Sequence, residues 1–173
     1  MFSFFKKKSP IGDKLYRKIV EFSRNKYFYE IAKLPDIYQI RILLIFFHFS
    51  FLFIELKKKD EHAQYKKFFQ QIFDFLFNKI DEDMRENGLG DVSVSKNMKI
   101  LINQFYNILL NSEEFKSFNN KEKIDLFTKY FIDEKNALNA DIAELINYFN
   151  KYQTFCFDLS LNSVIKGDLN FKY

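Results

Sequence analysis

The chain has 173 residues, of which 47% are hydrophobic and 20% aromatic. It can therefore bury a sizeable core and does not belong to the intrinsically disordered class. Its formal net charge of +4 is mild and acidic residues are interspersed throughout, which argues against nucleic acid as the main partner. With only 4 glycines and 2 prolines, the chain lacks the turn residues of an all-β domain. Together these features predict one all-α domain, a bundle of about five to seven helices.

Residues 1–12 are predicted to form a flexible segment ahead of a helical domain of residues 13–173. The segment places an aromatic group directly before a basic one: Phe2, Phe4 and Phe5, then Lys6, Lys7 and Lys8. This order is the reverse of a secretory signal and fits a peripheral contact with an anionic membrane. The competing interpretation is an unanchored terminus, the more common state of chain ends.

Two helices are predicted in the first third of the domain. The first covers about residues 13–33 and ends before Pro35, because the residue preceding proline resists the helical conformation. Asp36 is a suitable N-cap for the second, over about residues 36–57. Its stretch 42–54 is the most apolar in the chain but is shorter than the roughly 20 residues of a membrane span. The pattern therefore predicts a buried central helix.

A third helix, over about residues 61–87, has the clearest amphipathic spacing in the chain. Phe75 lies off its apolar face, so we expect this ring either to be covered by another element or to be exposed. Gly88 suits the left-handed position that ends a helix. Ser93 or Ser95 is then expected to cap a fourth helix that reaches about residue 111.

The remaining chain is predicted to hold a short helix around residues 124–131 and a longer one over about 136–157. For residues 158–173, a helical turn and an extended packed strip are both open alternatives. Cys156, the only cysteine, lies between two phenylalanines and is expected to be a small buried apolar residue. A single cysteine forms no internal disulfide, so a reducing cytoplasm is the simplest location.

The central helix carries a sparse polar stripe, because Arg41, His48 and Glu55 are spaced seven apart and share one side. Since buried polar groups need partners, Arg41 and His48 are expected to face Asp74 and Asp81 of the third helix. We therefore predict a structural polar seam that is made of Asp36, Arg41, His48, Asp74 and Asp81. The alternatives for this seam are internal structure and contact with a client.

No nucleophile motif, phosphate-binding glycine loop or Cys/His metal spacing occurs, so we predict no enzyme activity, no metal and no cofactor. The acidic segment 81–86 is interpreted as containing an Asp81–Arg85 ion pair rather than a metal site. His48 is either a buried, hydrogen-bonded histidine or a ligand or base. His62 lies in a charged connector and is expected to be solvated.

Residues 81–91 read Asp-Glu-Asp-Met-Arg-Glu-Asn-Gly-Leu-Gly-Asp, which resembles the signature of the ubiquinol–cytochrome c chaperone family. Further similar positions follow the family order: Leu34-Pro35-Asp36, Arg41, His48, Phe73-Asp74, Met98-Lys99 and Phe105-Tyr106. The resemblance covers roughly residues 14–110, with a weaker match at 167–171. Ile40, Lys79 and Asn107-Ile108 depart from the family pattern.

The resemblance implies an all-helical, non-enzymatic assembly chaperone for cytochrome b or an early intermediate of ubiquinol–cytochrome c reductase, respiratory complex III. Contacts with the client or with a small partner protein would lie around the glycine turn, at Arg85, Glu86, Gly88, Gly90, Asp91, Lys96 and Lys99. An apolar client would require an exposed apolar groove. Since the start of the chain does not resemble a transit peptide, we expect a bacterial member at the cytoplasmic face of the inner membrane. The alternative is a membrane-peripheral helical scaffold for another partner.

Overall fold

The chain folds into helices only, as its apolar spacing and scarcity of turn residues predict. The computed structural model describes residues 10–59, 63–132 and 140–173, and all regular secondary structure within these ranges is helical. In chain order the elements are α1 (Pro10–Ser23), α2 (Lys26–Glu30), α3 (Tyr38–Lys59), α4 (Ala63–Glu86), α5 (Asp91–Asn111), the 3₁₀ turn η1 (Phe115–Ser117), α6 (Asn120–Phe131), α7 (Ile142–Asp158) and α8 (Leu161–Lys166). Helices α2 and α8 have five and six residues, so longer helices build the bundle. The predicted all-α class is confirmed.

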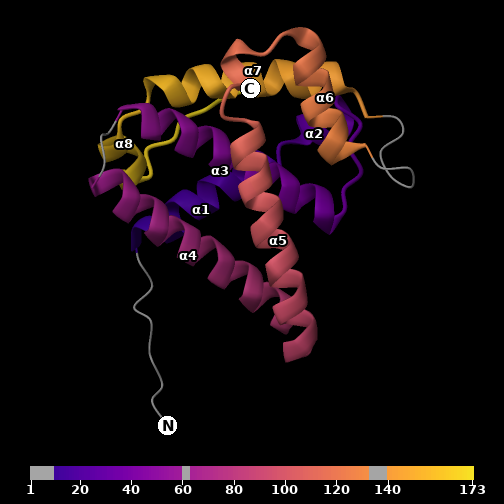
Figure 1. The fold of residues 1–173 in the computed structure, drawn as a ribbon, viewed down its shortest axis with the longest axis vertical. Helices are drawn as coiled ribbons and strands as arrows, with labels where there is room; N and C mark the ends of the chain where they lie inside the picture. The colour runs from indigo at the N-terminus through magenta and orange to yellow at the C-terminus, as the bar shows by residue number, and fades with distance from the viewer. Residues whose placement is uncertain (1–9, 60–62, 133–139) are drawn as a thin grey trace.

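Helix α3 forms the centre of the bundle. It packs against α1, α5 and α7, with smaller contacts to α4 and α6. Figure 1 shows α7 along the top of the view and the α4–α5 hairpin reaching toward the bottom. Sixteen of the 22 residues of α3 are buried, and Phe46, Phe47, Phe49 and Phe51 are fully enclosed. Burial of each such ring contributes roughly 1.5–3 kcal/mol, so α3 is the main source of core stability. The predicted central apolar helix is confirmed.

By length and composition, α3 is also the one helix in the described ranges that could cross a membrane. However, 89% of its most apolar window is buried by the surrounding helices. The core helix of a helical bundle meets the same criteria of length and hydropathy, so these criteria alone do not identify α3 as a membrane span.

The predicted first helix is divided in two, because side chains near Asn25 end one helix and begin the next. Ser23 Oγ donates to the carbonyl of Val20 (2.8 Å), at the end of α1. The side chain of Asn25 accepts from the N–H of Tyr27 (3.0 Å) and so caps α2. The irregular apolar spacing of residues 13–33, from which one helix was predicted, therefore did not reveal a break that local hydrogen bonds create.

Two predicted helix caps are wrong. Asp36 does not cap α3, which begins at Tyr38, because its carboxylate binds Arg41 instead. Gly90, rather than Ser93 or Ser95, is the N-cap of α5, since its extended backbone lets its carbonyl accept the N–H of Val94 (3.0 Å).

Phe75 is covered by α1, at a position where α1 has no side chain. A Cβ atom added to Gly12 would lie 2.8 Å from the Phe75 ring, so the glycine allows the two helices to approach closely. Tyr16, one turn later, meets the same ring edge-on with the ring centroids 5.8 Å apart. Of the two alternatives for Phe75, packing by another element is therefore correct.

The C-terminal residues combine the two alternatives that the sequence left open. Residues 161–166 form α8, which Gly167 ends in a left-handed conformation. The following residues have no regular secondary structure, and Phe171 packs edge-on against Phe22 of α1 and Tyr152 of α7, with ring centroids 5.9 Å and 5.2 Å apart. This packed C-terminal segment thus contacts both α1 and α7. Helix α7 begins at Ile142, and the predicted start near residue 136 lies outside the described residues.

Gly88 ends α4 in the left-handed conformation that the sequence predicts, with φ of 85°. The N–H of Leu89 donates to the carbonyl of Met84 (3.1 Å), and the N–H of Gly88 donates to that of Arg85 (2.9 Å). This pair of bonds is the Schellman arrangement, which turns the chain sharply into α5.

We predict that Gly88→Ser lowers the free energy of unfolding by about 1–2 kcal/mol, because a side chain with a Cβ is strained at positive φ. Gly90→Ser is the matched control: its φ is −74°, no atom lies within 4 Å of an added Cβ, and serine is a good N-cap. Urea denaturation of both variants measures the difference. Equal losses at the two positions would contradict the assigned turn.

Candidate functional site

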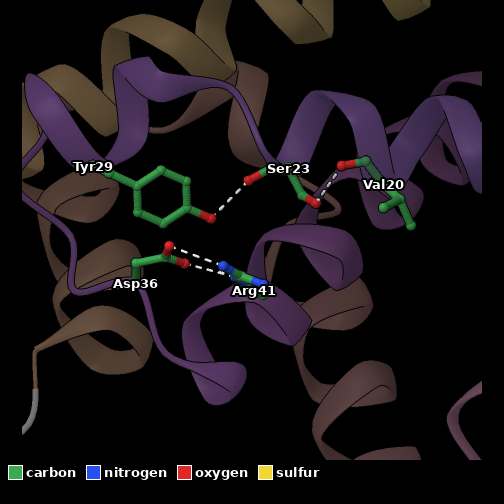
Figure 2. Close-up of polar contacts among 5 residues, drawn as sticks. All are labelled: Val20, Ser23, Tyr29, Asp36 and Arg41. Carbon is green, nitrogen blue, oxygen red and sulfur yellow. Dashed lines mark hydrogen bonds and ion pairs between the residues drawn. The ribbon is translucent and has the colours of Figure 1, made fainter. Parts of the chain in front are cut away.

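Arg41 and Asp36 form an exposed ion pair across the loop that precedes α3. Arg41 donates through Nε and Nη2 to the two carboxylate oxygens of Asp36, at 2.6 Å and 2.8 Å. Figure 2 shows this pair beneath Tyr29, whose hydroxyl donates to the carbonyl of Ser23 (2.8 Å). The guanidinium lowers the pKa of the Asp36 carboxyl below its usual value. Arg41 therefore fastens the α2–α3 loop and does not face Asp74, contrary to the prediction.

His48 is completely buried and both of its ring nitrogens are hydrogen-bonded. Nδ1 lies 2.6 Å from the carbonyl oxygen of Leu44, so Nδ1 must carry the proton. The hydroxyl of Tyr148 on α7 then donates a hydrogen bond to Nε2, at 2.7 Å. Burial lowers the pKa of His48 from 6.5 to about 4, which leaves the ring neutral at pH 7. Of the alternatives for His48, the buried structural histidine is confirmed.

Glu55, the third residue of the polar stripe on α3, was given no partner by the sequence analysis. Its side chain is buried, and Oε1 accepts from Gln153 Nε2 of α7 (3.0 Å) and from Lys58 Nζ (3.1 Å). His48 and Glu55 thus both face α7, whereas the predicted seam pointed to α4. Tyr148 and Gln153 are both buried on α7, but they lie five residues apart, so their spacing did not match that of His48 and Glu55 and gave no clear signal in the sequence.

The two carboxylates of α4 that were assigned to the seam lie at the surface. Asp74 is exposed and accepts from Gln70 (2.8 Å) on its own helix. Asp81 pairs with Arg85 Nε (2.7 Å), as predicted. The predicted seam across α3 and α4 is therefore wrong, because the polar stripe of α4 faces solvent and leaves its apolar side for the core.

Arg85 also bonds Asp91, the first residue of α5, so that one side chain links both helices of the hairpin across the Gly88 turn. These contacts raise the pKa of the guanidinium above its usual value. Glu86, Lys96 and Lys99 are exposed on the same hairpin. A role in client contact remains a prediction for Arg85, Glu86, Gly88, Gly90, Asp91, Lys96 and Lys99.

Helix α5 is the least buried of the long helices relative to its apolar content. Only Val94, Phe105 and Ile108 are buried among its 21 residues. Large apolar side chains are exposed along its outer side: Val92, Ile100, Tyr106 and Leu110. Isolated exposed apolar residues are common, but four on one helix make this helix the candidate contact surface. The sequence predicted an exposed apolar surface without locating it.

A groove of about 490 Å³ lies beside this surface, between the start of α3, the end of α4 and the first half of α5. Tyr38 and Ile100, with 47% and 55% of their surface exposed, line it together with Met84, Leu89 and Leu101. Asp83 also lines the groove. We name it the α4–α5 groove.

A smaller hollow of about 210 Å³ lies near the other end of the hairpin, lined by Tyr65, Phe69 and Leu110 among others. Among the described residues, no group of three or more histidine, cysteine or acidic side chains is arranged to hold a metal. Cys156 is fully buried, and burial raises the pKa of its thiol. His62 and the Phe and Lys residues of 1–9 lie outside the described residues.

The fold and surface define the class of protein: an all-helical bundle with exposed apolar side chains beside a groove, the kind of surface on which helix-in-groove recognition takes place. The chain belongs to the ubiquinol–cytochrome C chaperone family, whose sequence profile matches residues 30–171. Its fold is similar to the crystal structure of the Cbp3 homolog from Brucella abortus, with a TM-score of 0.77 and 23% identity over 96% of this chain and 91% of that chain. No curated protein matches the chain significantly.

We predict that the stability of the fold depends on the neutral state of His48. In the unfolded chain the imidazole takes up a proton below pH 6.5, whereas in the fold it does so only near pH 4. The free energy of unfolding should therefore fall as the pH decreases through this window, by up to about 3 kcal/mol from this group. Urea denaturation at a series of pH values measures it.

Replacing His48 with glutamine should flatten this part of the pH dependence. His62→Gln is the matched control, since a histidine in a charged connector is expected to contribute no such slope. An unchanged slope in His48→Gln would show that other groups cause the pH dependence.

Proposed function

We propose that the protein is a non-enzymatic assembly chaperone that binds cytochrome b, or an early assembly intermediate of ubiquinol–cytochrome c reductase that contains it. Membership of the chaperone family supports a protein client. The observation that carries the proposal is the row of exposed apolar side chains on α5 next to the α4–α5 groove. Such a surface can cover the apolar helices of a membrane-embedded subunit before they insert.

The proposed place of action is the cytoplasmic face of the inner membrane of a bacterium, with a small partner protein as a further candidate in the complex. The net charge of +4 is compatible with work beside anionic lipid. Residues 2–8, with three phenylalanines and three lysines, are the proposed peripheral contact with that membrane.

The direct test is crosslinking in the cells that produce the protein, followed by identification of the captured subunits. Cytochrome b should be enriched relative to other membrane proteins of similar abundance. Deletion of the gene should lower the amount of assembled complex III. Normal levels of complex III in the deletion strain would contradict the proposal.

We predict that Ile100→Asp lowers the capture of cytochrome b about tenfold or more, because the client contact would desolvate the new carboxylate. Ile124→Asp on α6 is the matched control, since Ile124 is exposed to a similar extent, 46%, but does not line the groove. Both exposed sites should change stability by no more than about 0.5 kcal/mol. Equal capture by the two variants would place the client elsewhere on the surface.

A further inference from the structure

Asp83 is the one charged side chain among the residues that line the α4–α5 groove. Its neighbours there are mostly apolar, and Tyr38 from the start of α3 lies near its carboxylate. Within the described parts of the chain, no lysine or arginine lies within 4 Å of the carboxylate oxygens, as an ion pair would require. Among the described residues this half-buried carboxylate therefore has no ion-pair partner, and Lys79 attracts it only from beyond that distance.

The basic residues closest along α4 are already engaged. Lys79, one turn before Asp83, pairs with Glu82 at 2.6 Å. Arg85 is held between Asp81 and Asp91. Burial, followed by repulsion from Glu86, raises the pKa of the Asp83 carboxyl. An incoming cation would relieve both effects, since it would replace lost solvation and offset the neighbouring negative charge.

We propose that the α4–α5 groove takes an apolar helical segment of the client that carries a lysine or arginine beside its apolar residues, and that Asp83 binds this cation. The inference rests on the proposed function and deepens it by naming the class of segment recognised. The volume of about 490 Å³ lies in the range of roughly 300–1,000 Å³ that encloses a small ligand. The groove therefore holds a few side chains at one end of a helix rather than its whole length.

The charge of the groove favours this occupant over a lipid surface. Asp83 lines the groove and Glu82 and Glu86 are exposed on the same turns of α4, so this edge repels anionic headgroups. Lys96 and Lys99 are exposed on α5 but do not line the groove. Segments with apolar residues next to lysine or arginine are common in membrane proteins, because their cytoplasmic loops carry an excess of basic residues.

The test uses the purified full-length protein and two fluorescent peptides with the same leucine-rich helix. One peptide ends in two lysines and the other in two glutamines, and fluorescence anisotropy measures both dissociation constants. We expect the lysine peptide to bind about tenfold more tightly, the effect of one charge-assisted hydrogen bond. Asp83→Asn should abolish this preference and leave binding of the glutamine peptide unchanged.

Asp74→Asn is the matched control, because Asp74 lies on the same helix but is exposed and does not line the groove. It should retain the full preference for lysine. Urea denaturation of both variants establishes that the fold is intact. If the unaltered protein binds the two peptides equally, the role of Asp83 is wrong while the apolar groove, and with it the proposed function, stands.

Ile100→Asn tests the apolar groove apart from its charge, because it adds a polar group without a second carboxylate. It should weaken both peptides, and unchanged binding of both would overturn the groove as the client site of the proposed function. A dimer that forms with rising concentration and is lost in Ile100→Asp would show that a second copy occupies the groove. A crosslink from position 100 to residues 1–9 would show that the chain's own start does so. Either result would overturn the inference.

Discussion

Burial of α3 on all sides is the constraint on which the rest of the fold depends. A helix with such a continuous apolar surface gains stability only if other helices remove it from water, and α1, α5 and α7 do most of this. The same burial requires a partner for each polar group that α3 carries inward. His48 and Glu55 find theirs on α7, in Tyr148 and Gln153. These bonds fix the rotation and register of α7 on α3, because a shift of either helix would leave a ring nitrogen of His48 unpaired and remove the Gln153 amide from Glu55.

The α4–α5 hairpin completes the enclosure of α3 and also provides the surface available to a client. The inner side of α5 contributes Phe105 and Ile108 to the core, while its outer side keeps exposed apolar residues that no described element covers. Helix α5 therefore serves both the core, through its inner side, and the exposed apolar surface, through its outer side. The groove between α3, α4 and α5, which is the proposed site for the client, is open in this structure.

The signature segment of residues 81–91 sets the geometry of that groove. Gly88 permits the tight turn, and Arg85 fastens the last turn of α4 to the first residue of α5. Leu89 and Met84, joined by a backbone hydrogen bond of the turn, both line the groove. Residues of the segment that resembles the family signature therefore shape the groove. Of the two candidate contact residues, Asp83 lies within this segment and Ile100 lies on α5.

Local rules allowed the sequence alone to establish the helical class, the interior position of α3, the left-handed turn at Gly88 and the Asp81–Arg85 pair. Each depends on residues within a few positions of one another, or on an apolar run that only burial can satisfy. The partner of His48 and the groove at Asp83 required the tertiary structure. Arg41 pairs with Asp36 only five residues earlier, but across a loop whose conformation helical periodicity does not describe. Helical periodicity shows which side chains share a face of one helix. It does not show which other helix that face contacts, and for His48 the partner, Tyr148, lies 100 residues away in the sequence. Only the packing of whole helices decides that choice, because several apolar faces compete for the same central helix.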